Sequence, residues 1–171
     1  MATHHIIPGD LVGCRPSAEF KLPDVEYLIG HNIDFDWKVA GEPDIKRICT
    51  LALSRWLFPE LDSHSQSAML YHFLPPEDAR ELCRGAHSAL ADVRNCLIVF
   101  TSLVEEMRNR GMSVNSWGGV YAASEIARVP TIISFGKHKG SSLKDLPRDY
   151  VVWLLKQSDL DPYLVQALRA V

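Results

Sequence analysis

The stretch YLIGHNIDFDW, residues 27–37, decides how this chain is interpreted. An apolar run ends at Gly30, and five side chains that could form a site follow within six residues: His31, Asn32, Asp34, Phe35 and Asp36. Polar groups at the end of a buried strand often form a site, and carboxylates suit hard divalent ions. The stretch therefore predicts a buried strand with a candidate site at its carboxyl end, and residues elsewhere must complete that site.

Composition predicts a soluble globular protein. The chain has 171 residues, 47% apolar and 23% charged, with a formal net charge of −3, which fits one domain or a small domain with an appendage. No apolar run approaches the ~20 residues that span a bilayer, and the first ten residues lack a signal-peptide pattern. The four cysteines show no C-x-x-C spacing, so we expect free thiols and a cytoplasmic protein without membrane contact.

Hydrophobic periodicity predicts alternating strands and helices in the first 110 residues. Residues 1–23 are punctuated by Pro and Gly and predict an irregular segment. The elements expected after it are a strand at 24–32, helical turns at 35–41, a strand at 45–49 that turns helical up to Pro59, a capped helix over 67–73, a short helix from 75 and a long helix over 88–110. The long helix has an apolar face at helical spacing: Leu90, Val93, Leu97, Phe100, Val104 and Met107.

A second cluster that could carry chemistry is His87-x-x-x-x-Asp92, at the start of the long helix. An α-helix turns about 100° per residue, so the two side chains would point about 140° apart if both were helical. They can face one site only if His87 lies on the loop before the helix. Gly85 permits such a loop and Ser88 can cap the helix. We therefore expect a fixed carboxylate at Asp92 and a mobile histidine at position 87.

The last third of the chain predicts a linker and a small module. Residues 111–129 hold three glycines around a helical candidate at 121–127, and residues 130–171 predict an α/β module with a strand, a Gly-Lys turn and one or two helices. The module has six basic and four acidic residues, a balance of +2 that leaves −5 for the remainder and hints at a polyanionic partner. Lys137 and Lys139 at the turn are either solvated or contact phosphates. We interpret four tryptophans as core residues rather than base-stacking platforms: Trp37, Trp56, Trp117 and Trp153.

Several motifs resemble those of one enzyme family. LIGHNIDFD (28–36) resembles the second motif of the DEDDh, DnaQ-like 3′–5′ exonucleases, and AHSALADV (86–93) is similar to their third motif, H-x-x-x-x-D. THHIIPGD (3–10) and ICTLALSRWLFP (48–59) resemble the segments before and after the second motif. SFGKHKGSSLKDLPRDYVVWLL (134–155) resembles the C-terminal module of bacterial exonuclease X. The resemblance covers nearly the whole chain.

The resemblance implies an RNase H-like exonuclease fold, with a sheet flanked by helices, and hydrolysis of phosphodiester bonds at single-stranded or frayed DNA 3′ ends. It implies two Mg²⁺ or Mn²⁺ ions about 4 Å apart. Asp36 and Asp92 would be metal ligands, and His87 would take the proton from water. By itself Asp36 would also fit a helix N-cap.

The same resemblance implies nucleic-acid contact by residues around the second motif and in the C-terminal module: His31, Asn32, Phe35, Lys137 and Lys139. His31 and Asn32 also fit a different role, in which they brace the end of the strand.

The family's first motif, D-x-E, supplies two further carboxylates and precedes the segment that THHIIPGD resembles. The D-x-E of this chain, Asp24–Glu26, leads into the second-motif strand and cannot also form a neighbouring strand. We therefore expect an N-terminally incomplete sheet and impaired activity, through a misplaced start, a split gene or a genuine remnant. The alternatives are an inactive DNA-binding or partner subunit, a homodimer through the open sheet edge, or a missing N-terminal fragment supplied separately.

Overall fold

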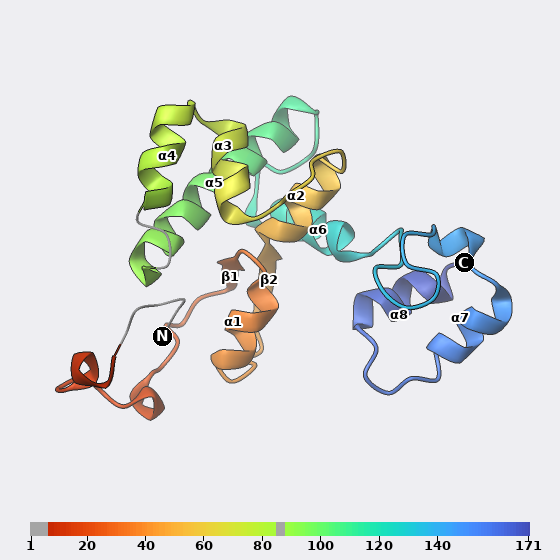
Figure 1. Ribbon diagram of the computed structural model, residues 1–171, viewed down its shortest axis with the longest axis horizontal. Coiled ribbons are helices and arrows are strands. Elements are labelled where there is room, and N and C mark those ends of the chain that lie inside the picture. The colour runs from red at the N-terminus through yellow and green to blue at the C-terminus, as the bar shows by residue number, and fades with distance from the viewer. Residues whose placement is uncertain (1–6, 85–87) are drawn as a thin grey trace. The chain divides into compact units, whose positions relative to one another are not determined.

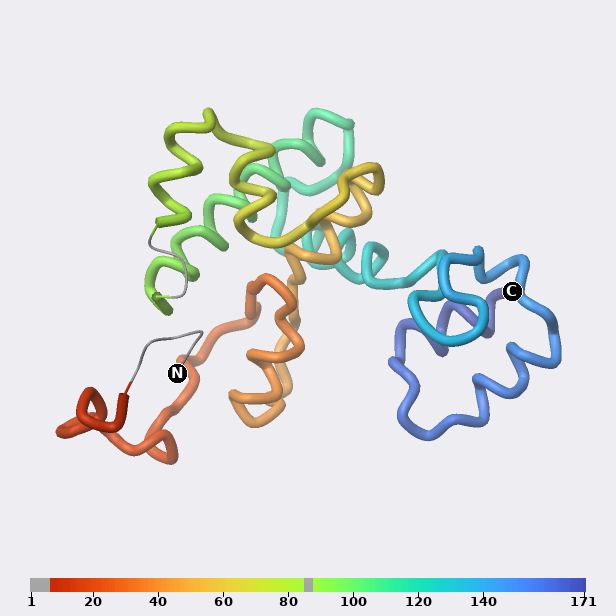
Figure 2. Tube along the Cα trace, in the orientation of Figure 1, coloured from red at the N-terminus to blue at the C-terminus, as the bar shows by residue number. Residues whose placement is uncertain are grey.

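The computed structural model describes residues 7–84 and 88–171. The chain divides into two compact units, residues 1–124 and 125–171, and each is described here by itself. Helices predominate, and the sheet in the described part of the chain is small (Figure 1 and Figure 2). The structure is therefore mixed α/β and mostly helical. The division between the units falls inside the segment expected to be a linker, 111–129.

The first unit contains a parallel βαβ element. β1, Tyr27–Gly30, pairs in parallel with β2, Lys46–Cys49, over all four residues of each strand. α1, Ile33–Val39, connects them. The described residues add no further strand to this sheet. The strands expected at 24–32 and 45–49 are confirmed with shorter bounds, and the helical turns expected at 35–41 begin and end two residues earlier.

Four helices follow the sheet: α2 (Thr50–Leu57), α3 (Gln66–Phe73), α4 (Pro76–Arg84) and α5 (Ala89–Asn109). α2 and α3 pack against α5, and α4 packs against α3 (Figure 1). The core between them contains Leu53, Met69, Leu103 and Met107, all with no exposed surface. Ser65 caps α3 by accepting a hydrogen bond from the Ala68 N–H at 3.2 Å. All four helices agree with the expected positions.

The apolar face of α5 divides into two halves. Phe100, Val104 and Met107 are buried, as an amphipathic helix on a core requires. Leu90, Val93 and Leu97 are 60%, 66% and 60% exposed, although they continue the same periodicity. The expectation of one continuous core-facing stripe is therefore wrong for the N-terminal half of the helix, which lines a cavity described below.

α6, Trp117–Arg128, is longer than the helical candidate expected at 121–127. Val120, Ala123 and Ser124 are buried, and Ser124 Oγ accepts a hydrogen bond from the Cys49 N–H at 2.9 Å. This part of the helix therefore belongs to the first unit. Trp56, Trp117 and Trp153 are 39%, 54% and 52% exposed, so the interpretation of these three tryptophans as core residues is wrong.

The second unit is built on a small apolar cluster that includes Ile133, Leu143, Leu154, Leu164 and Leu168. Its elements are the 3-10 helix η3 (Leu143–Asp145), α7 (Arg148–Leu154) and α8 (Pro162–Arg169). The strand expected at the start of this module is wrong, because Ile132 makes only an isolated antiparallel bridge to Ser142. Proline and glycine punctuate this stretch and leave too few residues for a ladder.

The residues before β1 form two 3-10 turns, η1 (Pro8–Leu11) and η2 (Ser17–Glu19), without a buried residue. This agrees with the irregular segment expected there. Within the described ranges, no helix is long and apolar enough to cross a membrane.

Candidate functional site

The candidate site begins where the two parallel strands end. His31 follows β1 and Thr50 follows β2, and His31 Nδ1 lies 3.0 Å from Thr50 Oγ1. Thr50 Oγ1 also donates to the Gly30 carbonyl at 3.3 Å. Since the threonine hydroxyl has one proton and gives it to Gly30, His31 Nδ1–H is the donor to Thr50. The ends of the strands are thereby held together at the edge where ligands commonly bind in parallel sheets.

The turn from β1 into α1 is tight. A side chain at Gly30 would place its Cβ 2.6 Å from Ile33 Cδ1, so any larger residue would have to displace the end of the Ile33 side chain. Asn32 is the N-cap residue of α1 in the left-handed conformation, with φ 69°, and its side chain makes no cap hydrogen bond. This turn puts Asp34 and Asp36 in the first turn of α1, where the helix dipole favours negative charge.

The two aspartates of α1 have different surroundings. Asp34 forms an ion pair with Arg47 on β2, whose guanidinium stacks 3.9 Å from the centre of the Trp37 ring. Asp36 lines the cavity instead. Asp36 is not the N-cap of the helix, because Asn32 occupies that position. The carboxylate at position 36 is therefore the one available to a ligand.

Asp92 lies in the first turn of α5, where Ser88 is the N-cap residue. The backbone carbonyl of Asp92 accepts a hydrogen bond from Gln66 Nε2 at 3.0 Å, which joins the first turns of α3 and α5. The positive end of α5 also favours a carboxylate at position 92, so the residue has a structural role beside any chemical one.

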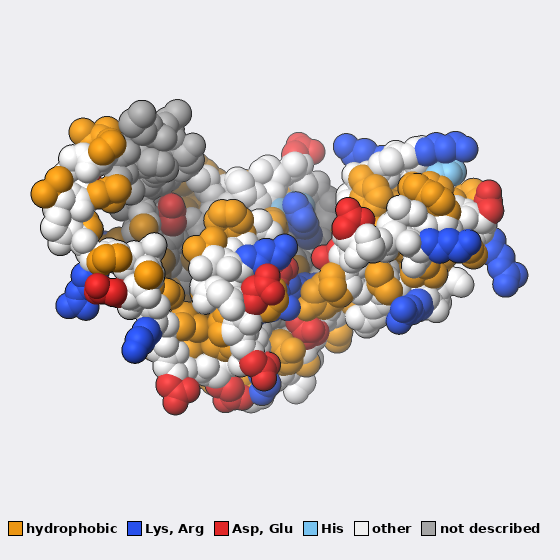
Figure 3. Space-filling view, turned by 90° about the horizontal axis from the view of Figure 1, so that it is seen from below, with side chains coloured by type: hydrophobic (Ala, Val, Ile, Leu, Met, Phe, Trp, Pro, Cys, Tyr) orange, Lys and Arg blue, Asp and Glu red, His pale blue; other side chains and the backbone are white. Residues whose placement is uncertain are grey.

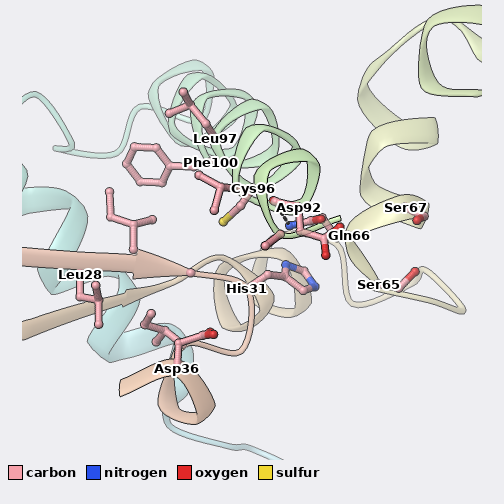
Figure 4. Close-up of a pocket in the computed structure, with 15 residues that line it drawn as sticks. Leu28, His31, Asp36, Ser65, Gln66, Ser67, Asp92, Cys96, Leu97 and Phe100 are labelled. Atoms are coloured by element: carbon pink, nitrogen blue, oxygen red, sulfur yellow. Dashed lines mark hydrogen bonds between the residues drawn. The ribbon is translucent and has the colours of Figure 1, made fainter. Parts of the chain in front are cut away.

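Asp36 and Asp92 line one cavity of about 900 Å³. Figure 4 shows His31 between Asp36 on α1 and Asp92 on α5, with Cys96 and Leu97 further along α5. The other lining residues are apolar, small or polar: Leu28, Ile29, Gly30, Ile33, Ser65, Gln66, Ser67, Ala89, Val93 and Phe100. The two carboxylates, separated by 56 residues in the sequence, thus line the same cavity.

Burial sets the charge states of two side chains that line this cavity. It lowers the pKa of His31 from its ordinary value of 6.5. The Nε2 atom of His31 is buried and makes no hydrogen bond to the described residues. Burial raises the pKa of the Cys96 thiol. We therefore expect a neutral imidazole and a neutral thiol at neutral pH, so that Asp36 and Asp92 supply the negative charge.

The remaining candidate residues are distributed as follows. Phe35 is 67% exposed and Asn32 is exposed, and neither lines the cavity. Lys137 and Lys139 are exposed on a turn of the second unit. His87 lies outside the described residues, so its role as a base stays a prediction.

Sequence reasoning missed Gln66 and Cys96, which line the cavity, and Thr50, which bonds to His31 beside it. Thr50 could have been found, because residues that follow two paired parallel strands meet at one edge. Gln66 and Cys96 carried no signal, since their positions depend on how α3 and α5 pack. Among the described residues, no three His, Cys, Asp or Glu side chains are grouped closely enough to hold a metal ion.

Comparison with known proteins places the chain near a nuclease. It is 27% identical over 176 residues to exodeoxyribonuclease 10 of Escherichia coli strain K12, an alignment that covers 99% of this chain and 76% of that protein. The protein of the same name from Escherichia coli O6:H1 matches with the same identity and coverage. This distant similarity supports a relationship to exonucleases along the whole chain.

A family described as "Putative quorum-sensing-regulated virulence factor" matches residues 124–162, which lie almost entirely in the second unit. No solved structure matches the chain.

Proposed function

We propose that the chain is a metal-dependent 3′–5′ exonuclease that acts on DNA ends, on a variant of the RNase H-like exonuclease fold. The proposal rests on the meeting of Asp36 and Asp92 at one cavity beside the carboxyl ends of β1 and β2. The distant similarity to an exodeoxyribonuclease supports it independently of that geometry.

Each residue then has a defined task. Asp36 and Asp92 would hold Mg²⁺ or Mn²⁺, for which carboxylate oxygens are suitable ligands. A divalent ion bound there would stabilise the attacking and leaving oxygens of the phosphodiester. His87 would take the proton from the attacking water. His31 braces the strand ends through Thr50 and keeps the turn that carries Asp36 in place.

The carboxylates that the described residues bring to the cavity fit one divalent ion better than two. Mg²⁺ commonly keeps several waters and is held by one or two carboxylates with substrate phosphates. Two ions carry four positive charges, whereas the acidic residues lining the cavity are Asp36 and Asp92. We therefore expect slow hydrolysis, because small errors in the position of reacting groups cost on the order of 10²-fold in rate.

An added strand would complete the cavity. Within the described residues β1 has one hydrogen-bonded neighbour, β2, and the exposed Val93 and Leu97 of α5 line the same cavity as β1. A two-stranded sheet is marginal, and an open edge invites pairing. We propose that a further strand, from a separate segment or a second copy of the chain, covers this edge and brings additional carboxylates.

The second candidate function is an inactive DNA-binding or partner subunit. The small number of carboxylates that residues 7–84 and 88–171 bring to the cavity favours it. This candidate predicts DNA binding without shortening of the substrate under any metal condition.

Degradation of a 5′-labelled single-stranded oligonucleotide with Mg²⁺ or Mn²⁺ separates the two functions. The nuclease predicts a ladder of products shortened from the 3′ end, abolished by EDTA and by Asp36→Asn or Asp92→Asn. Asp34→Asn is the matched control, because Asp34 lies on the same helix but pairs with Arg47. Degradation that survives Asp36→Asn and Asp92→Asn would mean that the reaction occurs elsewhere, and binding without shortening would establish the second function.

A further inference from the structure

The second unit carries a row of three contacting rings, in which His138 is tilted by 59° against Tyr150 and Tyr150 stacks on Trp153. The His138 ring lies 4.5 Å from the Tyr150 ring, and the Tyr150 ring lies 5.5 Å from the Trp153 ring with an angle of 25° between the planes. Tyr150 and Trp153 are three residues apart on α7 and therefore share one helix face. Trp153 is 52% exposed, so the row ends in an indole that is open to solvent.

The glycine turn is fitted against this row. A side chain at Gly136 would place its Cβ 2.7 Å from Tyr150 Oη, and Gly136 has φ 69°, so only glycine lets the turn approach this closely. Within the turn, the Gly140 N–H donates to the Ile133 carbonyl at 2.8 Å and the Ser141 N–H donates to the His138 carbonyl at 3.0 Å. The turn therefore holds His138 on Tyr150 and fixes the residues on either side of it.

Lysines lie at both ends of the row. Lys137 and Lys139 flank His138 and are exposed. Lys156 is also exposed. It follows Trp153 by three residues, and its backbone N–H donates to the Trp153 carbonyl at 3.2 Å. Figure 3 shows blue basic side chains around hydrophobic ones on this unit, at the right of the view, with a pale-blue histidine among them. The unit has a net charge of +2.

We propose that this stacking surface, His138, Tyr150 and Trp153 with Lys137, Lys139 and Lys156, binds single-stranded DNA by stacking a base on Trp153. Proteins that bind single strands combine positive charge that follows the backbone with aromatic rings on which bases stack. The inference rests on the proposed function, for which it provides a second contact to the DNA strand. A duplex hides its bases, so this surface selects single strands and frayed ends.

The buried face of α7 explains why Trp153 is free for this contact. Leu154 is buried in the core of the unit, and its neighbour Trp153 points away from that core. An indole exposed without a ligand costs hydrophobic free energy, and pairing with a base recovers part of it. The lysines alone would give binding that depends on phosphates and not on bases.

The test is the binding of a fluorescent oligothymidine to the full-length chain in EDTA, measured by fluorescence anisotropy. EDTA removes metal, so the outcome does not depend on hydrolysis. Trp153→Ala should raise the Kd about 5- to 100-fold, the range expected for the loss of one base-stacking contact. Trp153→Phe should restore most of the affinity, and Val152→Ala is the matched control at an exposed neighbour on α7.

A second ligand separates stacking from charge. An oligonucleotide of the same length with abasic sites keeps the phosphates and loses the bases, and it should bind the wild-type chain as weakly as the intact oligonucleotide binds Trp153→Ala. Equal binding of the intact and abasic strands would overturn the proposal, and so would an unchanged Kd for Trp153→Ala. Binding to anionic lipid vesicles with the same dependence on Trp153, and not to DNA, would assign the surface to a membrane instead.

Failure of this inference and failure of the proposed function give different results. A chain that shortens DNA but binds intact and abasic strands equally retains the nuclease and lacks the stacking surface. A chain that binds through Trp153 but never shortens DNA retains the surface and lacks the nuclease.

Discussion

His31 Nδ1 lies 3.0 Å from Thr50 Oγ1, and this bond joins the residue after β1 to the residue after β2. The threonine has no exposed surface, so its hydroxyl can bond only within the protein. The short sheet that carries the candidate site is therefore fixed at its carboxyl end by side chains as well as by backbone pairing.

Thr50→Val should destabilise the protein. Valine keeps the shape of threonine but leaves the Gly30 carbonyl and His31 Nδ1 without their partner, which costs about 1–3 kcal/mol. Urea unfolding followed by circular dichroism measures the free energy of unfolding. Thr101→Val is the control, because Thr101 Oγ1 bonds to carbonyls of its own helix at an exposed position. An equal effect of the two substitutions would contradict the bracing role of Thr50.

The stability of the protein should fall with acid through His31. Burial lowers the pKa of His31 in the folded chain below the ordinary value of 6.5, so the unfolded chain binds this proton at a higher pH. The contribution of neutral His31 to the free energy of unfolding is therefore complete above about pH 6.5. It is lost as the pH falls through the lowered pKa of the folded state. Urea unfolding at pH 7.5 and at pH 5 should show a larger loss for wild type than for His31→Gln. Equal losses of stability in wild type and in His31→Gln would show that His31 does not titrate in this way.

Mn²⁺ binding should depend on both cavity aspartates. Titration calorimetry without DNA should show Asp36→Asn and Asp92→Asn each weakening Mn²⁺ binding by roughly 10-fold or more, since even the loss of partners of metal ligands costs about 10- to 100-fold. Asp34→Asn should bind as wild type does, because the Asp34 carboxylate is paired with Arg47. If only Asp34→Asn weakened Mn²⁺ binding, the binding site would have to be assigned to the other side of α1.

The two lysines of the glycine turn should set the salt dependence of DNA binding. Each phosphate contact contributes about 0.7 to the slope of log K against log salt concentration for single strands. Lys137→Ala combined with Lys139→Ala should therefore flatten the slope by at most about 1.4 units, without changing sequence preference. Lys38→Ala, at an exposed position on α1, provides the control. An unchanged slope would leave the turn with a structural role only.

The order of elements in the first unit could be predicted from sequence because each has a local signal. Gly30 ends an apolar run, Ser65 is a capping residue, and the periodicity of α5 continues to Met107. The placement of Asp36 and Asp92 at one cavity follows the expectation from the pair of motifs and not from periodicity. Local signals cannot bring together residues that are 56 positions apart.

Burial was harder to predict than secondary structure. Leu97 and Met107 lie on one periodic stripe, yet one is 60% exposed and the other has no exposed surface. Periodicity identifies the apolar side of a helix but does not show which part of that side has a partner. Trp153 was misassigned for the same reason, because its exposure depends on how α7 is placed by Leu154 and by the glycine turn.

The hydrogen bond from Gln66 Nε2 to the Asp92 carbonyl has a consequence for engineering of the chain. It connects the beginnings of α3 and α5 directly, so the position of Asp92 does not depend on a fixed length for the segment between them. The chain should therefore accept extra residues between α3 and α4, such as a short tag, without displacement of Asp92. A reporter inserted there would label the protein while leaving the first turn of α5, which carries Asp92, unchanged.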